Sequence, residues 1–206
     1  EVVAVLEPGF GVATVEKLAI NAVMAGCRPE HFPVLLAAVE AVADPRFLLR
    51  IAAMSTGPHA PLILVNGPIA KALGINSGRC ALGPGAPSYP NVVIGRALRL
   101  TYMNVGQAYP GLMDMDTIGS ANKFSLCAAE NEEANPWEPF HVEKGFDRDA
   151  STVTVQTVYG QTDVLDFANT TPERILQTVV SAATNIAIGS TGRWREGHWA
   201  DPRTKV

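Results

Sequence analysis

Chemically reactive side chains crowd into one short segment of this chain, Phe124 to Phe146. The rest of the sequence is poor in charge and rich in Ala, Val, Leu and Gly. In such a background, these groups are either solvated, paired with one another or held for chemistry. The segment is therefore expected to hold the functional site, and its candidate residues are Cys127, Glu130, Asn131, Glu132, Glu133, Trp137, Glu138 and His141.

The spacing within this segment suggests an activated thiol. Cys127, Glu130 and Glu133 follow one another at intervals of three, so we expect them to share one face of a helical turn. Two rigid X-Pro pairs precede His141, and we expect His141 to fold back over that face. A cationic imidazole lowers the pKa of a nearby thiol and makes it a nucleophile or a redox thiolate, whereas a glutamate opposes this. The predicted catalytic residues are Cys127, Glu130, Glu133 and His141.

The same side chains allow two other interpretations. Cys127, Glu133 and His141 are all possible metal ligands, although the chain has no C-x-x-C or H-x-x-x-H spacing, and the sequence identifies no metal or cofactor. Alternatively, the glutamates form a solvated acidic turn and Cys127 is a small buried hydrophobe. Both interpretations stay open at the level of sequence.

A second candidate site follows an apolar stretch, Pro61 to Val65, which is typical of a central parallel strand. The stretch runs through Asn66-Gly67-Pro68 into a short helix ending at Gly74, and binding groups collect at the carboxyl end of such strands. Backbone N–H groups here, with Arg79 nearby, suit a carboxylate or a phosphate. No G-x-G-x-x-G or G-x-x-x-x-G-K-[ST] pattern is present, so nucleotide binding is not favoured. The predicted substrate-binding residues are Arg28, Asn66, Gly67, Arg79, Asn131 and Trp137.

Arginines elsewhere have a functional and a structural interpretation. Arg28 follows Cys27 just past a helix end, which is either an exposed thiol beside a positive charge or a plain connector. Arg96 and Arg99 share a helical face, where they either clamp an anion or lie on an exposed surface.

Hydrophobic periodicity predicts a single α/β domain over residues 1–206, with a mixed or mostly parallel sheet flanked by helices. Gly, Pro and capping residues set most of the expected boundaries. Residues 186–206 are expected to form an extended tail whose tryptophans pack on a partner. The expected helices are Val12–Ala25, Pro33–Asp44, Asn91–Val105 and one opening at Thr171-Pro172, and the expected strands are Phe47–Ala53, Pro61–Val65 and Ser151–Tyr159.

Composition narrows the class of protein. Of the 206 residues, 47% are hydrophobic and only 17% are charged, so part of the surface is expected to be buried against another subunit. The net charge of −4 argues against nucleic acid as a partner, and no apolar run is long enough to cross a membrane. Three widely spaced cysteines suit reduced thiols in the cytoplasm. The start at Glu1 suggests a trimmed N-terminus or a fragment.

Several strings of the chain resemble the UGSC-like family, a group of cysteine- or selenocysteine-containing proteins. They are VEKLAINAVMAGCRPEHFPVLLAAVEAV, LILVNGPIAKALGINSG, ALGPG, IGRALRL and SLCAAENEEANPWEPFHVEKGF, within Val12 to Val155. The resemblance implies thiol or selenol chemistry. The family's Cys (or selenocysteine)-Gly-Ser-Cys motif is absent here, since SGRC and AGCR do not match it. The resemblance therefore implies that this chain is a companion module and that a second subunit or domain carries the redox motif.

Three functions follow as hypotheses. The first is one subunit of a hetero-oligomeric cytoplasmic enzyme, an oxidoreductase or lyase that acts on a small anionic metabolite by thiol-dependent redox or bond-cleavage chemistry. The second is a lyase or hydratase that uses Glu and His as acid and base, with or without a metal. The third is a non-catalytic structural subunit whose reactive segment forms an interface.

Overall fold

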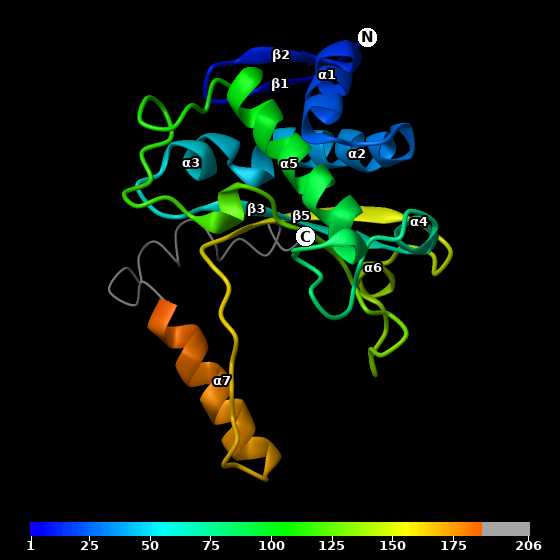
Figure 1. Cartoon of the computed structure of the whole chain (residues 1–206), viewed down its shortest axis with the longest axis vertical. Coiled ribbons are helices and arrows are strands. Elements are labelled where there is room, and N and C mark those ends of the chain that lie inside the picture. Colours follow the sequence, from blue (N-terminus) through cyan, green and yellow to red (C-terminus); the bar gives the residue numbers. More distant parts are fainter. Residues whose placement is uncertain (187–206) are drawn as a thin grey trace. The chain divides into compact units, whose positions relative to one another are not determined.

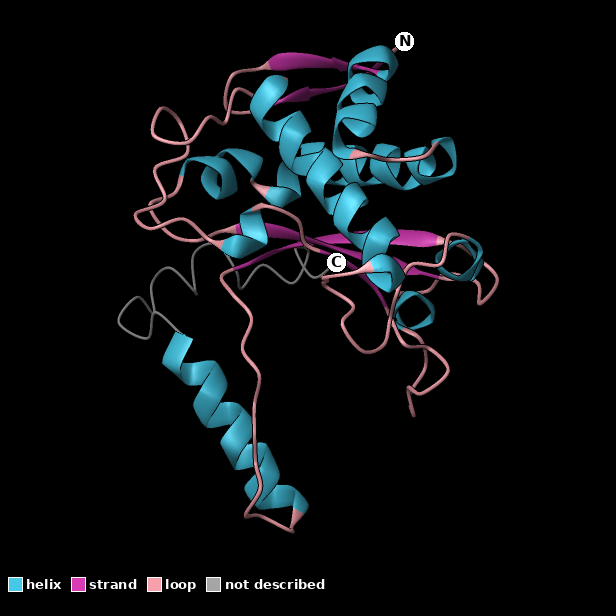
Figure 2. Ribbon diagram, in the orientation of Figure 1, coloured by secondary structure: helices cyan, strands magenta, loops and turns pink. Residues whose placement is uncertain are grey.

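The computed structural model describes residues 1–186, which divide into two compact units, residues 1–158 and residue 159 onward. The first unit contains a two-stranded sheet, a three-stranded mixed sheet and the helices that accompany them (Figures 1 and 2). The predicted α/β class is confirmed. Apart from the helix end at Ile186, the predicted tail lies outside the described residues.

Helices and strands are interspersed through the first unit. Short 3₁₀ turns occupy Pro29–His31, Pro45–Phe47, Ala86–Ser88 and Ala121–Lys123. The second unit contributes α7 (Pro172–Ile186). The elements of the first unit are β1 (Val2–Leu6), β2 (Gly11–Thr14), α1 (Val15–Ala25), α2 (Phe32–Ala43), α3 (Leu49–Met54), β3 (Ala60–Asn66), α4 (Pro68–Ala72), α5 (Tyr89–Asn104), β4 (Cys127–Ala129), α6 (Phe140–Glu143) and β5 (Thr152–Val158).

Strand β3 is the middle strand of the three-stranded sheet, whose order is β4-β3-β5. It pairs in parallel with β4, where Val65 lies opposite Ala129, and antiparallel with β5. Ile63 and Val65 are fully buried, while the alternate residue Leu64 is half-buried. Helices α1, α2 and α5 lie between this sheet and the β1–β2 pair (Figure 1). The core therefore lies on the helix-covered face of the sheet.

Gly, Pro and capping residues set the helix ends as expected, with two exceptions. Helix α5 begins at Tyr89 and not at the predicted Asn91, because Ser88 is its N-cap and Pro90 lies in its first turn. Gly26 ends α1 in the left-handed region at φ 92°, where glycine has no Cβ penalty. At its start, however, α1 begins at Val15 rather than Val12, because the preceding residues pair with β1. Thr14 caps the helix, its hydroxyl oxygen accepting a 3.2 Å hydrogen bond from the Lys17 N–H.

The predicted strand Phe47–Ala53 is wrong, because these residues form a 3₁₀ turn and helix α3. Leu48, between the two, adopts a left-handed conformation with φ 57°, which an extended strand cannot contain. The stretch is too short and too uniformly apolar for periodicity to separate helix from strand.

Helix α7 begins at Pro172, as predicted from Thr171-Pro172. Its periodicity places Ile175, Leu176, Val179, Val180 and Ala183 on one apolar face, of the kind that packs against a neighbour, and within the second unit these residues are accessible. The periodicity that produces the face is intrinsic to the helix, whereas burial needs a surface to cover it. Within residues 1–186, no helix is long and apolar enough to span a membrane.

Candidate active site

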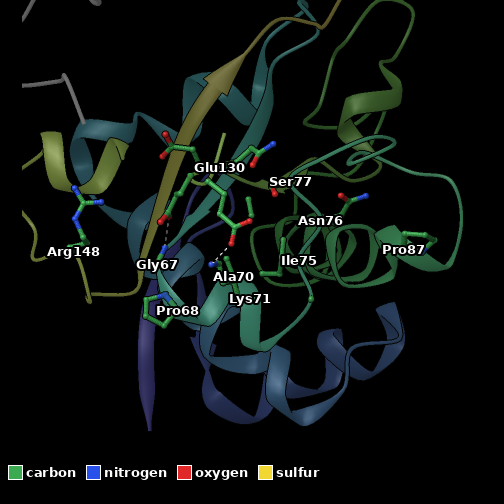
Figure 3. A pocket seen from close by; sticks show the side chains of 15 residues that line it. Gly67, Pro68, Ala70, Lys71, Ile75, Asn76, Ser77, Pro87, Glu130 and Arg148 are labelled. Atoms are coloured by element: carbon green, nitrogen blue, oxygen red, sulfur yellow. Dashed lines mark hydrogen bonds and ion pairs between the residues drawn. The ribbon is translucent and has the colours of Figure 1, made fainter. Parts of the chain in front are cut away.

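A cavity of about 640 Å³ opens where the parallel strands β3 and β4 end. Carboxyl ends of parallel strands are where α/β proteins gather binding groups. Figure 3 shows Arg148 on one side of Gly67 and Asn76 with Pro87 on the other. The polar and charged side chains that line the cavity are Lys71, Asn76, Ser77, Glu130, Asn131, Glu132, Glu133 and Arg148.

Asn66 and Gly67 form the turn that leaves β3 at the cavity. The Asn66 side chain is fully buried, and its amide nitrogen donates hydrogen bonds to Glu130 and Glu132. Gly67 has φ 82°, and a Cβ there would lie 2.1 Å from the Ala150 carbonyl oxygen. No other residue therefore fits at this position. The backbone N–H of Gly67 donates a 2.7 Å hydrogen bond to Glu132 Oε1.

Glu130 follows β4 directly and fastens the neighbouring segments together. Its Oε1 accepts a 2.6 Å hydrogen bond from the Asn135 amide, and its Oε2 accepts one of 2.8 Å from the Phe140 backbone N–H. With Asn66 added, both oxygens are occupied by protein donors. Glu130 therefore holds the site together and has little capacity left for a substrate.

Glu132, at the cavity, lies close to the buried His141. His141 lies on α6 with 1% exposure, and its Nε2 is 3.2 Å from the Arg148 carbonyl oxygen. Since a carbonyl only accepts, Nε2 carries the proton in this hydrogen bond. Nδ1 has no hydrogen-bond partner within the described residues and lies 3.9 Å from Glu132 Oε1. Nδ1 therefore faces the same Glu132 oxygen that Asn66 and Gly67 hold.

Charged side chains at the rim of the cavity form solvent-exposed ion pairs. Lys71 and Glu133 form a 2.5 Å ion pair with both side chains largely exposed, and the hydrogen bond from Lys71 lowers the pKa of Glu133. Arg148 pairs with Glu138 at 2.8 Å, also in the open. Exposed pairs of this kind contribute little to stability and exchange partners readily. Both cations are therefore available to an anionic ligand.

Cys127 is not on a helical turn with Glu130 and Glu133, as predicted, because it begins strand β4 opposite Ile63. It belongs to the hydrophobic core with 1% exposure, and it is not among the residues that line the cavity. Burial raises the pKa of its thiol, with a smaller contribution from Cys27. This environment is the opposite of the one that activates a thiolate.

The remaining predicted residues are scattered. Asn131 lines the cavity, whereas Arg28, Arg79 and Trp137 do not. The Arg28 guanidinium lies 5.3 Å from the centroid of the Tyr89 ring, and Trp137 is 80% exposed.

A metal-binding interpretation draws no support from the geometry. Within residues 1–186, no group of three or more His, Cys, Asp or Glu side chains is arranged to hold a metal ion. The predicted ligands Cys127, Glu133 and His141 therefore do not converge on a common point.

Glu132 was predicted as a candidate but not among the catalytic residues Glu130 and Glu133, yet it is the glutamate paired with His141. The helical spacing was misleading, because the residues form a strand and a turn. This backbone directs Glu132 toward Asn66 and Gly67. Lys71 and Arg148 were also missed. Only its position in the sequence could have indicated Lys71. It lies less than one helical turn after Asn66-Gly67-Pro68, and therefore near the same end of the strand.

No family model, curated protein or solved structure matches this chain. The likeness to the UGSC-like family stays a prediction. Function is therefore argued from the site, since a fold class alone does not carry one.

Proposed function

We propose that this chain is an acid–base enzyme, a lyase or hydratase acting on a small anionic molecule held in the cavity at the ends of β3 and β4. The observation that carries the proposal is the position of Glu132. One carboxylate oxygen is held by Asn66 and Gly67, and His141 lies behind it with an unpartnered ring nitrogen.

Glu132 has the properties of a positioned base. Its Oε1 accepts both protein hydrogen bonds, while Oε2 has no partner within the described residues and remains for a substrate proton. The side chain lines the cavity and is 24% exposed. A carboxylate fixed through one oxygen and open at the other meets the geometric requirement for general base catalysis.

His141 would act through Glu132 rather than touch the substrate. Because Nε2 is engaged with the Arg148 carbonyl, only Nδ1 faces the glutamate. The ring lies behind Oε1, the oxygen that Asn66 and Gly67 hold, and would help to keep Oε2 directed at the substrate. His141 is therefore a positioning residue in this proposal.

The cations at the rim support an anionic substrate. Lys71 and Arg148 lie at the cavity, each in an ion pair with an exposed glutamate. A substrate carboxylate that displaced these glutamates would be neutralised, and the neighbouring C–H bond would become more acidic. Ser77 and Asn131 supply further hydrogen-bonding groups to the same space.

Thiol-dependent chemistry ranks behind this proposal for a physical reason. A nucleophilic or redox thiol needs access and a lowered pKa. Cys127 is buried, and its pKa is raised. Glu132, by contrast, lines the cavity and is partly exposed.

The test compares two adjacent glutamates. We expect Glu132→Gln to slow C–H proton exchange of a bound substrate about 10²- to 10⁴-fold, since it removes the base while keeping the shape. Glu133→Gln is the matched control and should stay within about threefold, because Glu133 contacts only the exposed Lys71. Exchange into D₂O is followed by ¹H NMR over a panel of small hydroxy acids and unsaturated acids.

Two results would contradict the proposal. Exchange that persists unchanged in Glu132→Gln would remove Glu132 from the chemistry. Loss of assembly size in gel filtration before any loss of exchange, in Glu132→Gln or His141→Gln, would support the structural-subunit hypothesis instead.

We also propose that the chain works as one subunit with a second polypeptide or domain. Its low charge content of 17% and the exposed apolar face of α7 support this. Sedimentation of the purified chain, alone and with a partner that carries the Cys-Gly-Ser-Cys motif, tests this proposal. A chain that stays monomeric and is fully active alone would contradict it.

A further inference from the structure

A second cavity, of about 370 Å³, lies between α5 and the loop that precedes β4. It shares no lining residue with the first cavity, so it is a separate space in the same unit. Its lining is unusually rich in charge for this chain. Three cations and two carboxylates meet there, namely Arg96, Arg99, Lys123, Asp114 and Asp116.

Four of these charges form a buried network. Arg99 and Lys123 are each 9% exposed. Arg99 Nη2 donates to Asp114 Oδ2 at 2.9 Å, and Lys123 Nζ lies 2.7 Å from Asp114 Oδ1 and 3.0 Å from Asp116 Oδ2. Two positive and two negative charges balance here. The network therefore fixes the loop on α5 and holds the Arg99 guanidinium in place at the cavity.

Arg96 is the charged residue of this lining that lies outside the buried network. It lies three residues before Arg99 on α5 and is half-buried, with its guanidinium 5.0 Å from the centroid of the Phe124 ring. Within residues 1–186 it has no carboxylate partner. Three cations against two carboxylates leave the lining with one net positive charge.

Arg99 also has donors to spare. Of the five N–H groups of a guanidinium, the described residues engage only one, through Nη2. Its other nitrogens are not among the buried atoms that lack a partner, and the residue lines the cavity. Two neighbouring guanidinium groups, one fixed by an ion network and one by an aromatic ring, therefore face a common space.

We propose that this second cavity binds a small oxyanion, a carboxylate or phosphate group, between Arg96 and Arg99. Guanidinium groups match such anions through paired N–H donors, and these charge-assisted hydrogen bonds strengthen where water is partly excluded. The anion would neutralise the excess charge that the aspartates leave. This site does not depend on the acid–base function proposed for the first cavity.

Side-chain NMR of the full chain tests the proposal directly. Inorganic phosphate and, separately, succinate are titrated at constant ionic strength set with sodium chloride, while the Nε–Hε signals of Arg96 and Arg99 are followed. We expect a saturable shift of both signals. In Arg96→Gln, the affinity should fall about tenfold or more, because one charged pair of hydrogen bonds is lost.

Two further variants make the result specific. Arg96→Lys keeps the charge but loses the planar fork, and it should bind with intermediate affinity. Arg148→Gln removes a cation of the first cavity and should leave the Arg99 shift unchanged. Melting temperatures establish that each variant is folded.

The outcomes separate cleanly. Saturation with phosphate alone points to a phosphate-bearing ligand, and saturation with succinate alone points to a carboxylate. No saturable shift with either anion overturns the proposal. So does a shift that survives Arg96→Gln, or one that Arg148→Gln abolishes, since the anion would then bind elsewhere.

Discussion

At the scale of single residues, the three cysteines occupy three different environments. Cys80 is exposed, Cys27 is half-buried and donates a hydrogen bond to the Val93 carbonyl at 3.4 Å, and Cys127 is buried. Burial raises the pKa of Cys27 to about 11 and raises that of Cys127 as well. Since only the thiolate reacts with alkylating agents, accessibility and pKa act in the same direction here.

We therefore expect iodoacetamide to label Cys80 first, Cys27 far more slowly and Cys127 only after unfolding. Mass spectrometry of the native protein at about pH 8 measures the three rates, and labelling in urea supplies the unfolded reference. Fast native labelling of Cys127 would return the thiol hypothesis to first place.

The candidate site shows how far residue types alone can lead. The segment dense in reactive groups includes residues that line the cavity, Glu130 to Glu133, while its role stays a prediction. The choice among three neighbouring glutamates depended on whether the backbone is helix or strand, and a three-residue strand such as β4 leaves almost no periodic signal. Glu132 was therefore identified by its contacts, which come from residues far away in the sequence.

At the scale of elements, Gly95 allows α5 to approach the segment before β4 closely. A Cβ at this position would lie 2.3 Å from Ser125 Oγ and 2.6 Å from the Leu126 nitrogen. Alanine normally stabilises a helix relative to glycine, by about 1 kcal/mol. At Gly95, however, the close contact with the Leu126 backbone is expected to make alanine destabilising.

We expect Gly95→Ala to lower the free energy of unfolding by about 1–3 kcal/mol, measured by urea titration. Gly78→Ala is the matched control, because the nearest atom to its added Cβ, Asn76 Oδ1, is 3.6 Å away. It should change stability by less than about 0.5 kcal/mol. A stabilised Gly95→Ala would show that α5 and the segment can separate without cost.

Elements whose ends are set by Gly or Pro were predictable from the sequence, and elements without such residues were not. Gly26, Pro33 and Pro172 fixed three helix ends because their backbone preferences are local. Strands β1 and β2 went unpredicted, since their pairing depends on each other rather than on any pattern within Val2–Leu6 or Gly11–Thr14.

At the scale of the whole molecule, stability should depend on pH through His59, which is 3% exposed. Burial lowers the pKa of His59 from 6.5, and the positive charge of Lys123 adds to this effect. As the pH falls below 6.5, the unfolded chain therefore binds the proton before the native state does. Stability is present above that pH and is lost as the pH falls toward the lower, folded pKa.

The free energy of unfolding should accordingly decrease from about pH 7 to about pH 5, with a slope from one histidine of at most about 1.4 kcal/mol per pH unit. Urea titrations across this range measure it. The slope should be reduced in His59→Gln, and an unchanged slope would assign the effect to other groups.

The turn after β4 joins parts of the chain that are made at different times. Through Glu132 it binds the N–H of Gly67, which lies 65 positions earlier, and through Glu130 it binds the N–H of Phe140. During synthesis, the β3 half of the cavity therefore emerges long before the segment that completes it. Until then Asn66, whose amide needs both glutamates, has no partner for its side-chain nitrogen within the site. The side of the cavity that Glu130 and Glu132 form is consequently among the last parts of the first unit to assemble.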